Sequence, residues 1–300
     1  MKTWHIWDFP DTVYIRFNDN FRDEFFKIMF KRFRGKRPYA KFLGLTQMTV
    51  KNYHKGYSYK NGTKYSQSIP ISLLKKSLDL IDDELKEKLE RNIYLLKTHG
   101  NGLPVINPKL PVYESPAFYR IIAHIIGDGS APKNHLPYYA NTCKELREQL
   151  KEDLEIFGNV KVSETKTTTT PIVCFPKVIT DVLSHISQVR FTHPDRIPKD
   201  IFYASDDCKS AFLRALFDDE GTISTNLAIS MVNNNLIEQL RDLVSSMGVS
   251  VNSLSIKRDK LNGDSYYFSV KSNSFRNFRN KIGFSHPKKS RNLDAMLNIK

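Results

Sequence analysis

Two segments of this chain end in an acid followed by glycine, and a constant offset relates them. IIAHIIGDG ends in Asp128-Gly129, and LRALFDDEG ends in Glu220-Gly221, 92 residues later. Each acid follows an apolar run with helical spacing, so we expect both carboxylates at helix C-termini, where the helix dipole disfavours an acid by about 0.3–1 kcal/mol. If the two helices pack side by side, the acids meet and raise one another's pKa unless a cation lies between them.

Such a pair predicts a metal site. Mg²⁺ prefers hard oxygen ligands, keeps several waters and binds substrate phosphates. In phosphodiester hydrolysis, bound metal ions activate water and stabilise the leaving oxygen. The sequence therefore predicts Asp128 and Glu220 as metal ligands and as catalytic residues. The alternative, in which both acids only end a helix before glycine, stays open on these residues alone.

The elements around the two acids repeat in the same order. A helix-like segment at 143–158 has a counterpart at 234–248, and Phe191-Thr192-His193-Pro194 has a counterpart in Phe284-Ser285-His286-Pro287, 93 residues later. β-like segments lie between these markers in both halves. We therefore predict an α+β fold, a pseudo-symmetric domain made of a duplicated αββαββα unit. The expected boundaries of the two repeats are 117–195 and 196–300.

The two acid-containing segments resemble the two copies of the LAGLIDADG (DOD-type) homing endonuclease motif. The flanking sequences IPKDIF and KIGFSHPKKSRNLD are similar to that family as well, and the resemblance covers about residues 112–300. It implies a monomeric, site-specific endonuclease that hydrolyses double-stranded DNA with Mg²⁺ or a similar divalent metal. It also implies that Asp128 and Glu220 bind the metal and that each repeat cleaves one strand.

Close packing of the two motif helices needs small residues four apart. The first copy supplies Ala123 and Gly127, whereas the second supplies Ala215 and then Asp219, where the family usually has Ala or Gly. We expect this departure to loosen the helix interface or to add a charge beside the metals. Ile126 replaces the first acid of the motif. A lone helical histidine is usually structural, so we expect His124 in packing or in solvent rather than on the metal.

The resemblance also implies basic residues near the metals and a DNA-binding saddle made by the two sheets. Lys177 and Lys271, 94 residues apart, match the basic position and are candidate catalytic residues. A solvated lysine at a strand end is the alternative for each. The polar segments 160–170 and 253–270 are the candidate saddle strands. Within the second segment, Lys257, Arg258 and Lys260 are candidate DNA contacts.

The positive charge of the chain is concentrated at its N-terminal end. The formal net charge is +14; residues 1–110 carry 21 Lys and Arg against 11 Asp and Glu, whereas residues 111–300 carry 25 against 21. Positions 25–78 hold thirteen basic residues and no acid. A solvated surface normally mixes both signs, so this window favours a polyanionic partner over a surface kept basic for solubility.

The segment 36–55 within that window has the spacing of a helix–turn–helix. Ala40 is small enough for two helices to cross, Gly44 suits the turn, and Thr46 is a candidate N-cap of the second helix. The predicted DNA contacts are Gln47, Thr49, Lys51 and Asn52 on that helix and Lys31, Arg32, Arg34, Lys36 and Arg37 in the basic run before it. A plain helical hairpin and a solvated charge run are the respective alternatives.

The remaining N-terminal sequence completes a predicted unit of mainly helical structure. Residues 73–98 show helical spacing, and residues 99–116 hold four prolines, which is typical of a linker or an extended arm. We therefore predict a helical DNA-binding domain at 1–98 and a Pro-rich linker at 99–116.

Several classes of protein are disfavoured by the sequence. No apolar run reaches the roughly 20 residues of a membrane span and the start lacks a signal peptide, so we expect a cytoplasmic, intracellular protein without membrane contact or a small-molecule cofactor. The three cysteines are too few and scattered for a disulfide framework or a zinc site. The first residue and the terminal LNIK disfavour an intein. A cleavage-inactive DNA-binding transcriptional regulator is the main rival to the nuclease, and an RNA maturase is a weaker one.

Overall fold

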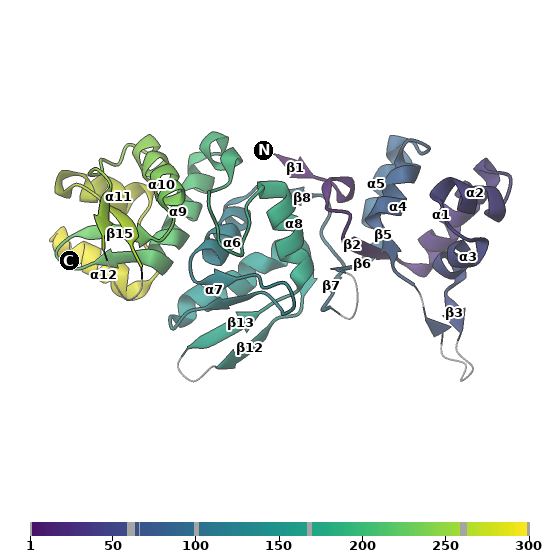
Figure 1. The fold of residues 1–300 in the computed structure, drawn as a ribbon, viewed down its shortest axis with the longest axis horizontal. Coiled ribbons are helices and arrows are strands. Elements are labelled where there is room, and N and C mark those ends of the chain that lie inside the picture. The colour runs from purple at the N-terminus through teal and green to yellow at the C-terminus, as the bar shows by residue number, and fades with distance from the viewer. Residues whose placement is uncertain are drawn as a thin grey trace.

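The chain folds into three units that follow one another along the long axis of the molecule (Figure 1). The computed structural model describes residues 2–58, 64–65, 67–98, 102–166, 170–258 and 263–298. An N-terminal unit with a small helical group lies at one end, a first αβ unit lies in the middle, and a second αβ unit lies at the other end. None of the helices in these described ranges combines the length and apolar character that crossing a bilayer requires.

The N-terminal unit combines short strands with five α-helices in its described residues. Its elements are β1 (Thr3–Trp4), β2 (Val13–Phe17), α1 (Asp19–Arg32), α2 (Lys36–Leu43), α3 (Gln47–Lys55), β3 (Tyr57–Ser58), β4 (Lys64–Tyr65), β5 (Ile69–Pro70), α4 (Ile71–Leu78), α5 (Asp83–Arg91) and β6 (Ile93–Thr98). Strand β2 lies between β5 and β6 in a five-stranded sheet. Its alternating burial places Val13, Ile15 and Phe17 in the core.

Helices α2 and α3 are joined by a short turn whose residues match their roles in the sequence. Gly44 ends α2 in the left-handed conformation, with a φ of 74° that suits glycine. Thr46 begins α3, and its side chain accepts a hydrogen bond from the backbone N–H of Thr49 at 3.1 Å. Ala40 and Val50 are buried where the two helices and α1 pack together.

The helical spacing at 73–98 predicts a longer helix than the structure contains. Helix α4 ends before Asp79, and a separate helix, α5, begins after Asp82, whose carboxylate accepts a hydrogen bond from Leu85 N at 2.8 Å. The segment Ile93–Thr98 is strand β6. The prediction was wrong there because pairing with β2 and β7 stabilises an extended chain that the local apolar pattern does not distinguish from a helix.

The Pro-rich segment contains paired strands in its described part, residues 102–116. These are β7 (Val105–Ile106) and β8 (Val112–Tyr113). Strand β7 pairs with β6 on one side and with β11 on the other, and β8 pairs with β1. Strand β11 (Asn159–Val160) belongs to the next unit, so one sheet spans the junction between the N-terminal unit and the first αβ unit.

The two αβ units have the same order of elements. The first contains α6 (Pro116–Ile126), β9 (Gly129–Ser130), β10 (Tyr138–Ala140), α7 (Lys144–Leu154), β12 (Ser163–Lys166), β13 (Pro171–Cys174) and α8 (Lys177–Ser187). The second contains α9 (Asp206–Glu220), β14 (Gly221–Ile223), β15 (Leu227–Met231), α10 (Asn234–Ser246), β16 (Ser255–Lys257), β17 (Ser265–Ser269), α11 (Phe275–Lys281) and α12 (Pro287–Met296).

The sheet topology confirms the predicted duplication. The first sheet has the order β9-β10-β13-β12 and the second has the order β14-β15-β17-β16, and every neighbouring pair in both sheets is antiparallel. Helices α6 and α9 each precede a sheet, and α7 and α10 each connect its second and third strands. The predicted α+β fold with two αββαββα repeats is therefore confirmed.

Helices α6 and α9 pack against each other at the junction of the two repeats (Figure 1). Both helices are mostly buried, and Ala123 and Ala215 are at most 1% exposed. Gly127 faces Asp219, because a Cβ built on Gly127 would lie 2.8 Å from the Asp219 Cβ. The expected small residues thus allow close approach of the two helices, and the junction carries the core of both repeats.

Candidate metal centre at the helix junction

Helices α6 and α9 begin in the same way, and each is followed closely by the acid and glycine of its motif. Ser115 caps α6 and Ser205 caps α9, each accepting a hydrogen bond from a backbone N–H three residues later. Glu220 is the last residue of α9 and leads directly into β14. Asp128 does not end a helix as expected, because α6 ends at Ile126 and Asp128 lies two residues further on, just before β9. A Cβ on Gly129 would lie 2.5 Å from the Ile125 Cα, and a Cβ on Gly221 would collide with the Phe217 carbonyl. Glycine after the acid is therefore required by this abrupt exit.

Asp128 lies close enough to Glu220 to raise the proton affinity of the Glu220 carboxylate. Burial, followed by the Asp219 charge, raises the pKa of Asp128 to about 6, although Asn141, Lys289 and His124 act to lower it. Burial, followed by the charges of Asp128 and Asp219, raises the pKa of Glu220 to about 7. These are the effects expected of carboxylates that share a partly desolvated site. The structure thus brings together the two acids that the sequence singled out.

The surroundings of the two acids differ. Asn141, which follows β10, donates from Nδ2 to the Asp128 Oδ2 at 2.8 Å. Within the described part of the chain, no donor hydrogen-bonds to the Glu220 carboxylate. Glu220 instead lines a hollow of about 480 Å³, together with residues of both repeats that include Ile126 and Ser230. One acid is therefore held by an amide, and the other is free to take up a ligand.

Of the two effects expected of Asp219, the structure shows the added charge beside the acids and not a looser helix interface. The Asp219 side chain is fully buried against Gly127, and Tyr139 donates a hydrogen bond to it at 2.6 Å. His124 Nδ1 lies 2.9 Å from the other carboxylate oxygen. Burial lowers the pKa of His124, but the Asp219 charge and hydrogen bond outweigh burial and raise it above its ordinary value. The first repeat thus supplies partners that the extra carboxylate needs.

Asp218, the first acid of the second motif, has a structural role. Its carboxylate accepts hydrogen bonds from the backbone N–H groups of Ser285 and His286 at 3.0 and 2.9 Å. These residues lie just before α12, so Asp218 fixes where that helix begins. Burial raises its pKa to about 6. The equivalent position of the first motif is Ile126, so only the second copy carries this acid.

Lys289 on α12 is the basic residue that the structure places next to the acids. Its amine donates to the carbonyl oxygens of Phe217 and Asp218 at 3.0 and 2.5 Å, at the end of α9. Burial lowers the pKa of Lys289, while the charges of the surrounding acids oppose that change. Its charge acts to lower the pKa of both Asp128 and Glu220. A lysine at this helix terminus also interacts favourably with the dipole.

The donor set fits a hard divalent cation. Asp128 and Glu220 provide two carboxylates with raised pKa values, and Mg²⁺ commonly uses one or two protein carboxylates with water and phosphate completing the shell. Across the described ranges, no group of three His, Cys, Asp or Glu side chains is arranged to hold a metal.

The other candidate catalytic lysines lie elsewhere. Lys177 begins α8, donates to the Pro132 carbonyl at 3.3 Å and lies 3.8 Å from Asp181. Lys271 is exposed just after β17, where it precedes a short 3-10 helix. Neither contributes to the pKa shifts of Asp128 or Glu220, whereas Lys289 contributes to both. The offset of 94 residues between Lys177 and Lys271 is consistent with equivalent positions, but the structure does not place either amine at the acids.

Most N-terminal candidate residues are on the surface. The exposed set comprises Gln47 and Lys51 on α3 and Lys31, Arg32, Arg34, Lys36 and Arg37 in the basic run. Thr49 and Asn52 are partly buried, and the Thr49 hydroxyl lies 2.9 Å from that of Thr46 within the helix cap. Met48, which is 61% exposed, also lies in the first turn of α3.

The candidate saddle strands are the outer strands of their sheets. Strands β12 and β16 occupy equivalent outer positions and are exposed along their length. Lys257 and Arg258 are exposed at the end of β16, and Lys260 lies outside the described residues. In Figure 1, β12 and β13 point to the same side of the molecule as β3, which follows α3.

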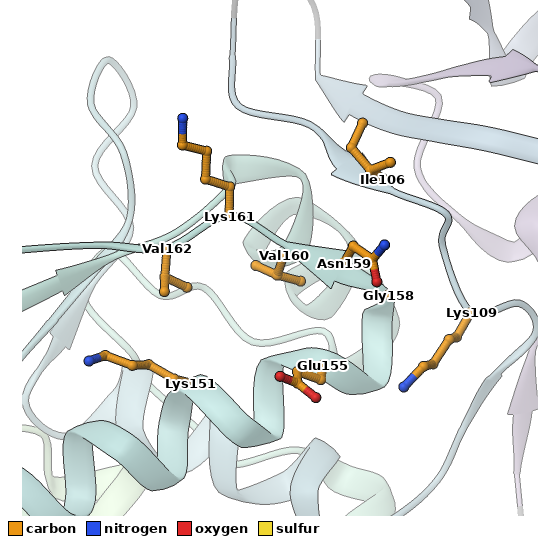
Figure 2. Close-up of a pocket in the computed structure, with 9 residues that line it drawn as sticks. All are labelled: Ile106, Lys109, Lys151, Glu155, Gly158, Asn159, Val160, Lys161 and Val162. Atoms are coloured by element: carbon orange, nitrogen blue, oxygen red, sulfur yellow. The ribbon is translucent and has the colours of Figure 1, made fainter.

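A separate hollow of about 570 Å³ lies where β11 meets β7 and the end of α7. Three lysines line it, but Figure 2 shows that the amines of Lys109, Lys151 and Lys161 point in different directions. Lys151 is also paired with Glu164 at 2.6 Å. This arrangement does not converge on one anion, so the hollow is not a second candidate site.

Four side chains near the acids were not anticipated from the sequence: Tyr139, Asn141, Asp218 and Lys289. One sequence signal was available, since Asn141 and Asn233 are also 92 residues apart and each precedes the helix that connects the second and third strands. Lys289 gave no such signal, because it lies 69 residues from Glu220 and only the fold brings its amine to the end of α9.

A comparison with protein families agrees with this geometry. Residues 207–283 match the family model described as LAGLIDADG-like domain. The chain contains a LAGLIDADG-like domain. The matched residues cover most of the second repeat, and the first repeat has the same topology in the structure. The resemblance inferred from the two motifs is therefore confirmed.

Individual proteins with similar segments or folds differ widely in their names. The chain is 28% identical to glutamine–fructose-6-phosphate aminotransferase (isomerizing) of Methanocaldococcus jannaschii over 94% of its own length, and it spans about a quarter of that relative, 27%. The homing endonuclease I-DmoI, solved in complex with DNA and Ca, covers 60% of this chain and 97% of its own, with 16% identity and a TM-score of 0.44. Full-length DUF199/WhiA from Thermatoga maritima covers 62% of this chain and 61% of its own, with 13% identity and a TM-score of 0.43.

Proposed function

We propose that this protein is a site-specific endonuclease that hydrolyses both strands of double-stranded DNA with Mg²⁺ or a similar divalent metal. The observation that carries the proposal is the meeting of Asp128 and Glu220 at the junction of α6 and α9. Each acid comes from one repeat, and each has a pKa raised by burial and by neighbouring carboxylates. Because one chain supplies both acids, we propose that the active form is a monomer.

The side chains at the junction support this chemistry by their placement. Asp128 and Glu220 would hold the metal, which supplies the polarisation of water and of the scissile phosphate when bound. Asn141 keeps the Asp128 carboxylate oriented, and Lys289 limits the rise in pKa of both acids. A protein that only binds DNA gains nothing from two carboxylates next to the phosphate backbone.

The N-terminal unit supports recognition of a particular sequence. We propose that residues 1–98 bind DNA, with α3 entering the major groove through Gln47 and Lys51 and with the basic run contacting phosphates. The sheets β9-β10-β13-β12 and β14-β15-β17-β16 would lie along the same duplex, with Lys257 and Arg258 at their outer edge. The acid-free window at 25–78 is the charge that such binding requires.

The test begins with the full-length protein and a random pool of duplex DNA. Bound sequences are selected without metal, and cleavage of the selected site is then measured with Mg²⁺ for the wild type, Asp128→Asn and Glu220→Gln. We expect each substitution to lower double-strand cleavage on the order of 1,000-fold or more, because a metal ligand is lost. Asp242→Asn, on the exposed side of α10, serves as the charge-matched control and should cleave like the wild type.

Two results would contradict the proposal. Tight binding of a selected site without wild-type cleavage would show a DNA-binding regulator instead of a nuclease. Cleavage that survives both substitutions would show that the acids are not metal ligands. For the N-terminal unit, Gln47→Ala with Asn52→Ala should change the selected sequence, whereas replacing the basic run should weaken all sequences alike.

A further inference from the structure

We propose that Asp219 is a positioning residue for the acid of the first repeat, so that scission of one DNA strand depends on Asp219 far more than scission of the other. This inference rests on the proposed endonuclease function. It follows from the unequal surroundings of the two acids and from an unusual feature of the interface, a fully buried carboxylate between α6 and α9.

The first step is that Asp219 belongs to the second repeat but is held by the first. Its carboxylate accepts from Tyr139 OH at 2.6 Å and lies 2.9 Å from His124 Nδ1 and 3.4 Å from Asn141 Nδ2. Burying a carboxylate without such partners costs free energy, so the three side chains stay in contact with it. The position of this part of the first repeat is thereby tied to α9.

The second step is that Asn141 transmits this position to Asp128. Its Nδ2 contacts both Asp219 and Asp128, at 3.4 and 2.8 Å, and its Oδ1 accepts a hydrogen bond from Cys143 N at 2.8 Å. With contacts at both ends of the amide, Asn141 has one orientation, and that orientation directs an N–H group at Asp128. Asp219 therefore helps to set the direction of the Asp128 carboxylate.

The third step is that the second repeat has no counterpart of this arrangement. An offset of 92 residues relates Asp219 to Gly127, which has no side chain, and Asn141 to Asn233. Asn233 accepts a hydrogen bond from Leu236 N at 3.1 Å, as the cap of α10. Among the described residues no donor reaches Glu220. Loss of Asp219 should therefore affect the orientation of one acid and leave the other unchanged.

The experiment measures the cleavage of each strand separately. The selected duplex carries a different label on each 5′ end, and single-turnover rates with Mg²⁺ are compared for the wild type, Asp219→Ala and Asn141→Ala. We expect both variants to slow the same strand by about 10- to 100-fold, the range typical of residues that orient a metal ligand, so that nicked duplex accumulates. The double variant should be little slower than either single variant, because Asp219 acts on Asp128 through Asn141.

Two further variants separate positioning from general stability. Tyr139→Phe removes one hydrogen bond to Asp219 without changing the helix interface, and it should slow cleavage of the same strand. It replaces Asp219→Ala in the test if Asp219→Ala folds poorly. Cys208→Ala removes a buried side chain at the far end of α9 and should not alter the ratio of the two strand rates. Equal slowing of both strands by Asp219→Ala and Tyr139→Phe, or an unchanged ratio, would overturn the proposal.

A measurement without cleavage tests the positioning directly. In protein labelled with ¹⁵N-asparagine, the side-chain amide signals of Asn141 are identified by their loss in Asn141→Ala. We expect these signals to shift in Asp219→Ala and to keep their position in Cys208→Ala. An unchanged signal would overturn the positioning role. If the wild type cleaves no DNA, the endonuclease proposal fails, and the NMR measurement still decides whether Asp219 orients Asn141.

Discussion

The two repeats share a backbone arrangement but surround their acids differently. Asp128 accepts a hydrogen bond from Asn141, whereas Glu220 has no donor among the described residues and lines a hollow. Lys289, which contacts the end of α9, is also without an equivalent at α6, because an offset of 93 residues leads to Arg196, and Arg196 pairs with Asp195 at 3.0 Å. Duplication thus conserves where the acids are placed, while the side chains around each acid have diverged.

This comparison indicates that the two carboxylates differ in how firmly their orientation is fixed. A carboxylate fixed by an amide presents one geometry to a ligand, and a carboxylate without a partner adapts to the ligand that arrives. Both remain costly to bury, as their raised pKa values show. The asymmetry therefore predicts that equivalent substitutions in the two repeats have unequal effects.

The largest unequal effect is expected for the equivalent asparagines. Asn141→Ala should lower the cleavage rate by about 10- to 100-fold, because Asp128 loses its orienting partner. Asn233→Ala should leave the cleavage rate close to that of the wild type and lower the free energy of unfolding by about 1 kcal/mol, because α10 loses its cap. Single-turnover cleavage and urea unfolding measure the two quantities. Equal rate losses in the two variants would contradict the asymmetry.

The next effect concerns the basic residues. Lys289→Met should shift the acidic limb of the pH–rate profile to higher pH by roughly one pH unit, because the cation that lowers the pKa of Asp128 and Glu220 is lost. Arg196→Met should leave the profile in place, since this guanidinium is paired with Asp195. Cleavage measured from pH 5 to 9 tests both variants. A downward shift in Lys289→Met would show that Lys289 does not act on the acids.

The smallest effect is on stability in the absence of metal. The folded-state pKa of Glu220 is about 7 against an ordinary value of 4.5, so the folded state holds this proton more tightly and loses stability as pH rises through that window. Glu220→Gln should therefore raise the free energy of unfolding by about 2 kcal/mol at pH 8 and by close to nothing at pH 4. Asp128→Asn should gain only about 1 kcal/mol, because it also alters the hydrogen bond with Asn141.

Chemical denaturation at pH 4 and pH 8, with EDTA present, measures these gains. Adding Mg²⁺ at pH 8 should stabilise the wild type and leave both variants nearly unchanged, since metal binding to the folded state shifts the unfolding equilibrium. A wild type that is more stable at pH 8 than Glu220→Gln without metal would contradict the raised pKa.

The sequence pattern was sufficient to predict the duplication and the positions of the two acids. Apolar helical runs that end in Asp128-Gly129 and Glu220-Gly221 are local signals, and the abrupt exit from helix to strand requires glycine at both places. The turn at Gly44 and the cap at Thr46 were likewise predictable, because each depends on a residue's own backbone preference.

The side chains that contact the acids could not be predicted from the sequence, because they come from segments that are distant along the chain. One expectation was that Asp219 disturbs the interface. Instead, Tyr139 of the other repeat donates a hydrogen bond to Asp219, and His124 of that repeat lies within hydrogen-bond distance. No local sequence pattern encodes such a match. The end of the predicted helix at 73–98 became strand β6 because a partner strand was available. The basic residue at the acids is Lys289, since α12 packs at the end of α9.

The sequence by itself determined the repeated α+β fold, the two acids of the repeated motifs and the concentration of positive charge before residue 111. These features follow from residue type and spacing within short segments. Only the tertiary structure decided which side chains hold those acids and how far their proton affinities rise. Hydrogen bonding and desolvation depend on atoms that approach from another repeat, and the distance between such atoms is set by packing.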